Sequence, residues 1–431
     1  MKKVLVLFLG LALVLTFTGI TTAKDGEVTV MSVWGGQELE AFKKAVKPFE
    51  EATGIEVKHE STRNLPTLLT TRLEAGNPPD IVHFTGIGMM EEYAQKGDLV
   101  DLKDVFKMKN FKNKYNQKWI DLSTYKNGMY GLYISADVKS LVWYNPKKFE
   151  EKGYTAPETW DELQSLMTKM KENGDTPWSV GLEAGGASGW PGTDWIEDIM
   201  LRTAGPEIYD KWVNHDISWT DPRVKEAWKK FGNIVKSHKN VWGGPMTVLS
   251  TNFGDAASPL FMDPPRAYMH KQASFVTSFI KENNPNLEAG KDFDFFVFPP
   301  INEEHGTPIM GAADMLSMMN DNPEAKAFMK YMSTAGAQSI WVGELGKLGT
   351  NKNINPNMYP DDMTRKMAKV LRNADSFRFD GSDSMPSAIG SGAFWKSIMN
   401  YVEPGGDNLD KILKQLEEKT DEVYNTGAAT N

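Results

Sequence analysis

The chain has 431 residues, no cysteine and only six histidines. The lack of cysteine excludes disulfide bonds, thiolate metal sites and cysteine nucleophiles. The histidines are scattered and never show the His-Glu-x-x-His spacing of zinc enzymes, so we expect no metal site and no cofactor. Stability must therefore come from side-chain packing in the core, which a chain of this length can supply.

Basic residues are fewer than acidic residues. Lys and Arg number 48 against 57 Asp and Glu, which leaves a formal net charge of -9. Nucleic-acid binding requires a basic surface to neutralise phosphates, so we expect no nucleic-acid partner. A hydrophobic fraction of 40% and a charged fraction of 24% are typical of a globular protein. Because the length exceeds what one core usually organises, we expect two domains.

The N-terminus carries an apolar run. Lys2 and Lys3 precede apolar residues 4–17, and the small residue Ala23 follows. This pattern predicts a secretory signal peptide over residues 1–23, cleaved near Ala23, and a secreted or periplasmic mature chain. A membrane anchor is the alternative, but the run is short for a spanning helix. A lipid anchor is excluded because no cysteine lies near the cleavage site.

Short apolar runs alternate with amphipathic helices along the rest of the chain. We predict strands over 28–33, 55–59 and 80–84, and a helix over 38–52 that ends at Gly54. Later helices have clear start signals, namely a Thr159/Glu162 capping box and N-caps at Asp221 and Asn322, each followed by proline. This alternation predicts an α/β fold.

Catalytic motifs are weak. The glycine-rich segment 185–189 lacks the lysine and the spacing of a phosphate-binding loop, and no Gly-x-Ser-x-Gly occurs. Asp194, Glu197 and Asp198 lie within about one helical turn and could serve a glycosidase. In the alternative, Asp194 faces a binding site while Glu197 and Asp198 cap or solvate the helix. Carboxylates that are helix neighbours rarely flank a scissile bond, so we expect no enzyme and no catalytic residue.

Several tryptophans lie beside glycines, prolines and carboxylates. Trp34 precedes two glycines at a predicted strand end, Trp190 lies in a predicted loop that opens a helix at Asp194, and Trp395 follows the acidic segment 379–383. Indole rings stack on the C–H faces of sugars, and carboxylates accept hydrogen bonds from sugar hydroxyls. These positions therefore indicate a sugar ligand.

The same segments resemble a known family. Residues 34–36, 49–57, 79–85, 92–97, 131–145 and 385–395 are similar to the extracellular sugar-binding proteins of bacterial ABC importers, which include maltose- and α-glucoside-binding proteins. Residues 187–202 and 379–386 are similar to the α-glucoside branch, whose ligands are trehalose, sucrose, maltose and related glucosides.

This resemblance implies a two-lobed periplasmic-binding-protein fold of type II, with a sugar held in a cleft between lobes that are joined by crossing strands. It places the first lobe at 24–137 and 299–335 and the second at 140–292 and 338–431. The partners it implies are a small sugar and the membrane permease subunits of an ABC importer, with a monomeric chain that works by hinge closure. A secreted glycoside-active enzyme and a sugar sensor that feeds a membrane receptor are the alternatives.

Candidate ligand contacts come from both expected lobes and from the crossing between them. They are Trp34, Gly36, Arg63, Thr85, Gly311 and Asp314 from the first lobe, Asp137 at the crossing, and Trp190, Asp194, Gln272, Phe275, Asp383 and Trp395 from the second. Lys139 also flanks the crossing, where it could contact ligand or only hold the hinge.

Five of these candidates also have an ordinary structural interpretation. Trp34 and Gly36 could form a tight turn, and Arg63 could form a surface ion pair. Asp194 could be a helix N-cap and Trp395 a core residue.

Overall fold

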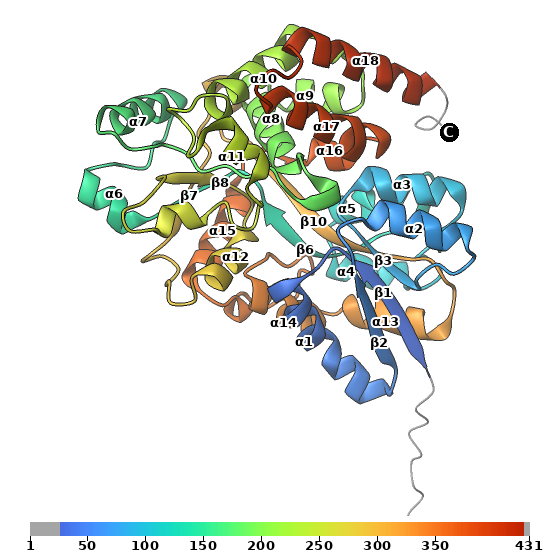
Figure 1. The fold of residues 1–431 in the computed structure, drawn as a ribbon. Coiled ribbons are helices and arrows are strands. Elements are labelled where there is room, and N and C mark those ends of the chain that lie inside the picture. Colours follow the sequence, from blue (N-terminus) through green and yellow to red (C-terminus); the bar gives the residue numbers. More distant parts are fainter. Residues whose placement is uncertain (1–25, 426–431) are drawn as a thin grey trace, which may run out of the picture.

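The structure is a computed structural model in which residues 26–425 are described; the expected signal peptide at 1–23 lies outside the described residues. The chain forms two α/β lobes (Figure 1). Strand β6 (Leu132–Val138) leads out of the first lobe and β7 (Leu141–Tyr144) begins the sheet of the second. Strand β10 (Ile309–Met318) returns the chain to the first lobe. The expected type II architecture is confirmed.

The first lobe is built on a six-stranded sheet. Strand β1 (Glu27–Ser32) pairs in parallel with β2 (Glu56–Ser61) and β3 (Ile81–Phe84). Strand β10 runs antiparallel to β3 and β6, and β11 (Phe377–Phe379) pairs in parallel with β10. Every residue of β3 and β6 is buried, because helices cover both faces of the sheet.

Two hydrophobic cores cover the two faces of this sheet. Helices α1 (Gly36–Thr53), α13 (Pro323–Met332) and α14 (Ala335–Leu345) share one core, and α2 (Leu65–Glu74) and α3 (Ile87–Lys96) share the other. Trp341 of α14 packs on Trp34 and Phe42, with ring centroids 4.7 and 6.4 Å apart. Smaller elements complete the lobe: α4 (Met108–Lys114), α5 (Gln117–Leu122), β4 (Thr124–Tyr125) and β5 (Gly128–Met129).

The second lobe is mostly helical around a three-stranded sheet. Strand β7 lies between β8 (Met269–Lys271) and β9 (Asp294–Val297), antiparallel to both. Its helices are α6 (Pro146–Lys152), α7 (Trp160–Glu172), α8 (Trp190–Thr203), α9 (Pro206–Val213), α10 (Pro222–Val235), α11 (Gly244–Ser250), α12 (Val276–Asn283), α15 (Asp362–Asn373), α16 (Gly381–Ser384), α17 (Trp395–Val402) and α18 (Leu409–Asn425). Single turns occur at Gly185–Ala187, Ser258–Phe261, Glu303–His305 and Pro356–Met358, with a π-helix at Ala388–Phe394.

The local start and stop signals are confirmed. Helix α1 ends at Gly54, whose φ of 76° is left-handed, and Thr159 and Glu162 form the capping box of α7. Asp221 and Asn322 cap α10 and α13. The predicted loop at 190–195 is wrong, because α8 already begins at Trp190 after Gly189 adopts φ 108°.

A buried ion pair ties α8 to the crossing segments. Arg202 is fully buried, pairs with Asp198 and donates from Nε to the carbonyl oxygen of Phe298 at 3.0 Å. Asp198 in turn lies 3.1 Å from Nζ of Lys271 and accepts a 2.8 Å hydrogen bond from Ser140. This group therefore joins α8 to the segments before β7 and after β9.

We expect the Arg202→Met variant to lower the free energy of unfolding by about 3–5 kcal/mol, because it removes one partner of a buried pair. The measurement is urea unfolding of the ligand-free protein. The matched control is Arg223→Met, since Arg223 forms an exposed pair with Asp221 at 2.7 Å and should cost less than about 1 kcal/mol. Equal losses in the two variants would contradict a structural role for the buried group.

Candidate ligand-binding site between the lobes

The cleft is organised around a buried lysine. Lys139 follows β6, and its Nζ lies 2.9 Å from Oδ1 of Asp194 and also pairs with Asp380. Asp194 comes from the first turns of α8, and Asp380 is the N-cap of α16. All three side chains are buried. One ammonium group therefore holds together three segments that are far apart in the sequence.

The two carboxylates of this group differ in their titration. Burial raises the pKa of Asp194 to about 7, against the opposing charge of Lys139. Burial acts in the same direction on Asp380, but there the charge of Lys139 and its hydrogen bond prevail and lower the pKa of that carboxyl. Burial alone would lower the pKa of Lys139, and the carboxylates of Asp194 and Asp380 hold that pKa well above its usual range. The environment of Asp380 therefore favours its charged form beside Lys139, whereas burial favours the protonated form of Asp194.

A second buried lysine organises the floor of the first lobe. Nζ of Lys347 lies 2.7 Å from Asp314 on β10, 3.2 Å from Glu38 and 3.6 Å from Asp137 at the end of β6. Asp314 also lies 2.9 Å from Nε2 of His83. Although burial alone would raise it, the pKa of Asp314 is lowered because Lys347 and His83 favour the charged form.

Two expected ligand contacts belong to this floor. Nε1 of Trp34 donates to Asp314 at 3.4 Å, and the Trp34 ring lies 4.3 Å from the His83 ring, measured between centroids. Trp34 is only 1% exposed. The structure therefore places Trp34 and Asp314 beneath the cleft surface, where they bind each other and their neighbours.

An aromatic wall connects the two lysine groups. The ring of half-buried Trp190 lies 5.2 Å from that of Phe253 and 5.9 Å from that of Phe275. Lys139 Nζ lies 5.4 Å from the Trp190 centroid, and Lys347 Nζ lies 5.9 Å from the Phe275 centroid. Cations over ring faces are favourable in such water-poor sites. The wall thus offers both ring faces and charged donors.

The two lobes touch across this site. The Arg63 guanidinium, from the first lobe, lies 5.1 Å from the Phe253 ring centroid. Exposed Thr85 follows β3, and a side chain at the next residue, Gly86, would lie 2.7 Å from the carbonyl oxygen of Asp383. Burial, followed by the charge of Asp380, raises the pKa of Asp383. Arg63 therefore meets Phe253 of the opposite lobe, and the segment after β3 meets Asp383 of the opposite lobe.

Trp395 stands at the end of the π-helix Ala388–Phe394 and begins α17. It is half-buried, and its backbone carbonyl lies against Gly189, the residue before Trp190. Among the described residues, Nε1 of Trp395 and Oδ2 of Asp194 are buried polar atoms without a hydrogen-bond partner. Single π-helical turns occur frequently at functional sites.

Three candidates have local structural roles. Gln272 is buried, and its side-chain oxygen accepts a 2.9 Å hydrogen bond from the amide of Ala273. Gly311 lies on β10, where a side chain would approach the carbonyl oxygen of Asp137 to 2.7 Å. Gly36 begins α1 with φ 52°, and a side chain there would lie 3.2 Å from the Glu282 carboxylate. Within residues 26–425, the Gln272 side chain makes no hydrogen bond to either lysine group.

The expectation that Glu197 and Asp198 cap or solvate α8 is wrong, because both are fully buried. Glu197 accepts hydrogen bonds from the amides of Gly381 at 2.8 Å and Ser382 at 2.9 Å, which fixes the first turn of α16. Asp198 is the partner of Arg202. Both carboxylates are occupied by the fold, so they do not form an acid–base pair around a substrate.

Residues of this site that were not among the candidates include His83, Phe253, Lys347 and Asp380. Asp380 lies inside the acidic segment 379–383, so its position was visible in the sequence. The other three carry no local signal, because each is brought to the site by a strand, loop or helix end that is distant in sequence from its partners.

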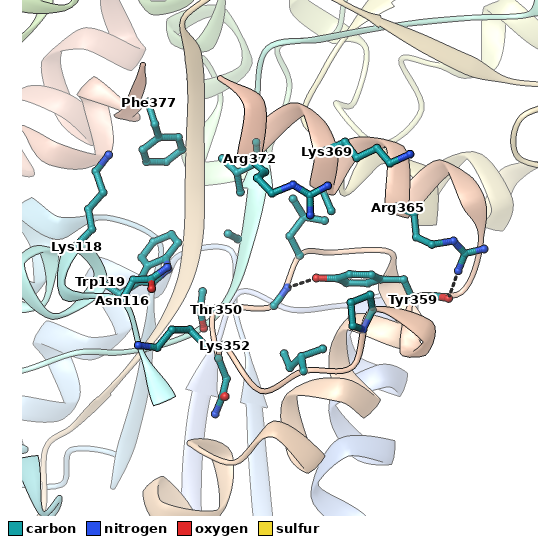
Figure 2. Close-up of a pocket in the computed structure, with 18 of the residues that line it drawn as sticks. Asn116, Lys118, Trp119, Thr350, Lys352, Tyr359, Arg365, Lys369, Arg372 and Phe377 are labelled. Atoms are coloured by element: carbon teal, nitrogen blue, oxygen red, sulfur yellow. Dashed lines mark hydrogen bonds between the residues drawn. The ribbon is translucent and has the colours of Figure 1, made fainter. Parts of the chain in front are cut away.

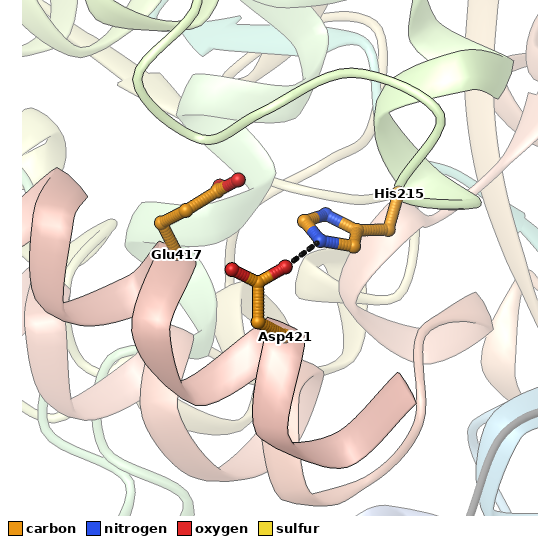
Figure 3. A group of neighbouring side chains, drawn as sticks. All are labelled: His215, Glu417 and Asp421. Atoms are coloured by element: carbon orange, nitrogen blue, oxygen red, sulfur yellow. Dashed lines mark hydrogen bonds and ion pairs between the residues drawn. The ribbon is translucent and has the colours of Figure 1, made fainter. Parts of the chain in front are cut away.

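One group of described residues could hold a metal ion elsewhere. His215, Glu417 and Asp421 have ligand atoms within 4.8 Å of one another (Figure 3). His215 Nε2 lies 3.1 Å from Asp421, and Glu417 accepts a 2.6 Å hydrogen bond from the amide of Trp219. These partners account for the group as a contact between α18 and the loop after α9.

The chain is similar to known proteins over most of its length. Residues 35–339 match the family model of bacterial extracellular solute-binding proteins. The chain belongs to this family. It is 41% identical over 391 residues to the osmoprotective compounds-binding protein GgtB of Synechocystis, covering 91% of each chain. It is 40% identical over 408 residues to the alpha-glucosides-binding periplasmic protein AglE of Rhizobium meliloti, covering 93% of this chain and 88% of the relative.

Solved structures confirm the fold. A chitin oligosaccharide-binding protein superposes with a TM-score of 0.79 at 21% identity, covering 92% of this chain and 98% of that one. Maltose-bound MalE3 of T. maritima gives 0.73 at 17% identity, covering 93% and 100%. The family is one of solute-binding proteins rather than enzymes, and it works outside the cytoplasm. Within residues 26–425, no helix combines the length and apolar character that crossing a membrane requires.

The raised pKa of Asp194 predicts a pH-dependent stability. Its pKa rises from 3.8 to about 7, so the folded chain holds this proton more tightly than the unfolded chain. The stabilisation it provides is complete below about pH 4 and is lost as the pH rises through about 7. In the Asp194→Asn variant this loss is absent, so the free energy of unfolding of the wild type should fall relative to the variant over that range.

Urea unfolding of both proteins at a series of pH values, without sugar, measures this difference. A difference that stays constant between about pH 4 and 8 would show that Asp194 does not titrate in that range.

Proposed function

We propose that this chain captures an α-glucoside or a related glucosyl solute outside the cytoplasmic membrane and delivers it to the permease subunits of an ABC importer. The observation that carries the proposal is the cleft itself, where half-buried rings lie beside charged donors and acceptors. The 40% identity to an α-glucosides-binding protein and the 41% identity to an osmoprotective compounds-binding protein support the same ligand class.

The side chains around the cleft suit both kinds of surface on a sugar, its apolar C–H faces and its hydroxyl groups. The Trp190 and Trp395 rings can stack on its C–H faces, while Asp194, Lys139 and Asp383 can bind hydroxyl groups. Hydrogen bonds to charged groups contribute about 1.5–3 kcal/mol each, so a few of them with one stacked ring can supply the about −8 kcal/mol of micromolar binding.

Binding closes the hinge. Arg63 and Thr85 approach the site from one lobe, and Trp190 and Asp383 from the other, so a sugar that contacts both sides favours the closed arrangement. Within this proposal the first lobe spans 24–137 and 299–335, and the second 140–292 and 338–431. The burial of Trp341 against Trp34 supports moving the third crossing to follow Leu345. The pairing of β11 with β10 also supports assigning residues 377–379 to the sheet of the first lobe.

Export depends on the N-terminal segment, where residues 1–23 act as a signal peptide. The basic start, the apolar run and Ala23 support this assignment. N-terminal sequencing of the exported protein should begin near Lys24; a start at Met1 in the exported form would refute cleavage.

We expect one α-glucoside to stabilise the purified mature protein in a thermal-shift panel of trehalose, sucrose, maltose, glucosylglycerol and glucosylglycerate. A ligand at about a thousand times its dissociation constant adds about 4 kcal/mol, which is a shift of several degrees. Chromatography should recover the sugar unchanged, and scattering of the same sample should show compaction. No shift with any carbohydrate would refute the ligand class, and consumption of the sugar would indicate an enzyme.

A pair of variants locates the site. Trp395→Ala should weaken binding of the active sugar at least about tenfold, because it removes a ring that stacks on the ligand. Trp160→Ala is the matched control, since Trp160 is a half-buried tryptophan of the same lobe that packs on Phe298. Equal affinities of the two variants would contradict the proposed role of Trp395.

A further inference from the structure

A cavity of about 630 Å³ lies behind the hinge (Figure 2). Its walls come from α5 and the residue before it, the loop after α14, α15 and β11, and Ala136 of β6 lines it as well. The neighbours of Ala136 on the strand, Ser135 and Asp137, bind Asp314 and Ser274 in the network beneath the cleft. Because side chains alternate along a strand, the cavity lies on the opposite face of β6 from that network.

The cavity is strongly cationic. Lys118, Lys352, Arg365, Lys369 and Arg372 line it, and none of the lining residues in the described part of the chain is Asp or Glu. This concentration is unexpected in a chain with a net charge of -9. Three of the cations come from α15 at spacings of four and three residues, so they share one helix face. In Figure 2, Lys118 lies across the cavity from the cations of α15.

Two of these cations are available to bind an anion. The side chains of Lys369 and Arg372 are exposed and make no hydrogen bond or ion pair with any described residue. Arg365 is partly engaged, at 2.6 Å from Asp362 and 3.3 Å from the Tyr359 carbonyl oxygen. Lys352 donates to the carbonyl oxygen of Lys112 at 3.1 Å. The cations of this cavity therefore keep N–H donors free, and free cationic donors indicate an acidic ligand.

The rest of the lining is aromatic and apolar. Half-buried Trp119, Tyr359 and Phe377 form part of the wall, and Lys118 Nζ lies 5.0 Å from the Phe377 ring centroid. Burial, with the charge of nearby Arg378, lowers the pKa of Lys118. A volume of this size is typical of small-molecule sites, which are mostly apolar with a few polar anchors.

We propose that this cavity binds a small organic anion, a phosphate ester or a carboxylate that carries a ring, at a site separate from the sugar cleft. Arg372 and Lys369 bind the acidic group, since a guanidinium forms paired hydrogen bonds with phosphate or carboxylate oxygens. Trp119 and Phe377 pack on the ring. The site uses no residue of the cleft, so this proposal does not depend on which solute binds in the cleft.

Calorimetric titration of the mature protein at low ionic strength tests this, with phenyl phosphate, benzoate, inorganic phosphate and phenol as probes. Phenyl phosphate should bind with one-to-one stoichiometry, more tightly than inorganic phosphate, and phenol should not bind. Binding of benzoate as well supports a site for ring-bearing anions in general, whereas phenyl phosphate alone supports a site for phosphate esters.

The double variant Lys369→Gln/Arg372→Gln should weaken phenyl phosphate binding at least about tenfold. Both side chains are exposed and unpaired, so the melting temperature should stay that of the wild type. The matched control is Lys229→Gln/Lys239→Gln, which removes two exposed cations outside the cavity.

The proposal is overturned if no anion binds, or if both double variants lose affinity equally, because general attraction to positive charge would then explain the signal. It is also overturned if inorganic phosphate binds as tightly as phenyl phosphate and the Lys369→Gln/Arg372→Gln variant leaves both unchanged, since the cavity rings and cations would then contribute nothing.

Discussion

The cleft of this protein depends on the ammonium group of Lys139, which is buried between Asp194 and Asp380. A buried charge is costly unless its partners stay in place, and loss of one partner typically costs about 3–5 kcal/mol. Lys139 lies at the crossing between the lobes, Asp194 near the start of α8 and Asp380 at the cap of α16. The need to neutralise one lysine therefore brings the hinge and two walls of the site together.

A second buried lysine, Lys347, forms a similar group of ion pairs on the first-lobe side of the site. Lys347 compensates Asp314 and Asp137 beneath the first lobe, and it faces Phe275 as Lys139 faces Trp190. The result is an aromatic wall with a cation at each end. Ring faces suit the C–H faces of a sugar and charged groups suit its hydroxyls, so this wall supports the proposed sugar site.

Much of the fold was predictable because its signals are local. A left-handed glycine ends α1, a capping box starts α7, and the alternation of strands and helices indicated an α/β protein. The resemblance of its motifs indicated the solute-binding family, which the family match confirms. The functional residues were harder to assign. Glu197 and Asp198 were expected to cap or solvate α8 and are instead fully buried, because the amides of α16 and the guanidinium of Arg202 compensate them.

The sequence by itself determined the class of this protein: a cysteine-free α/β chain with a secretion pattern and the motifs of sugar-binding relatives. Only the tertiary structure decided which side chains of those motifs face the cleft. Trp34 turns into the core against Trp341, while Trp190 joins Phe253 at the surface of the site. The physical reason is that helix and strand signals act over a few residues, whereas burial and charge compensation depend on segments that meet only after folding.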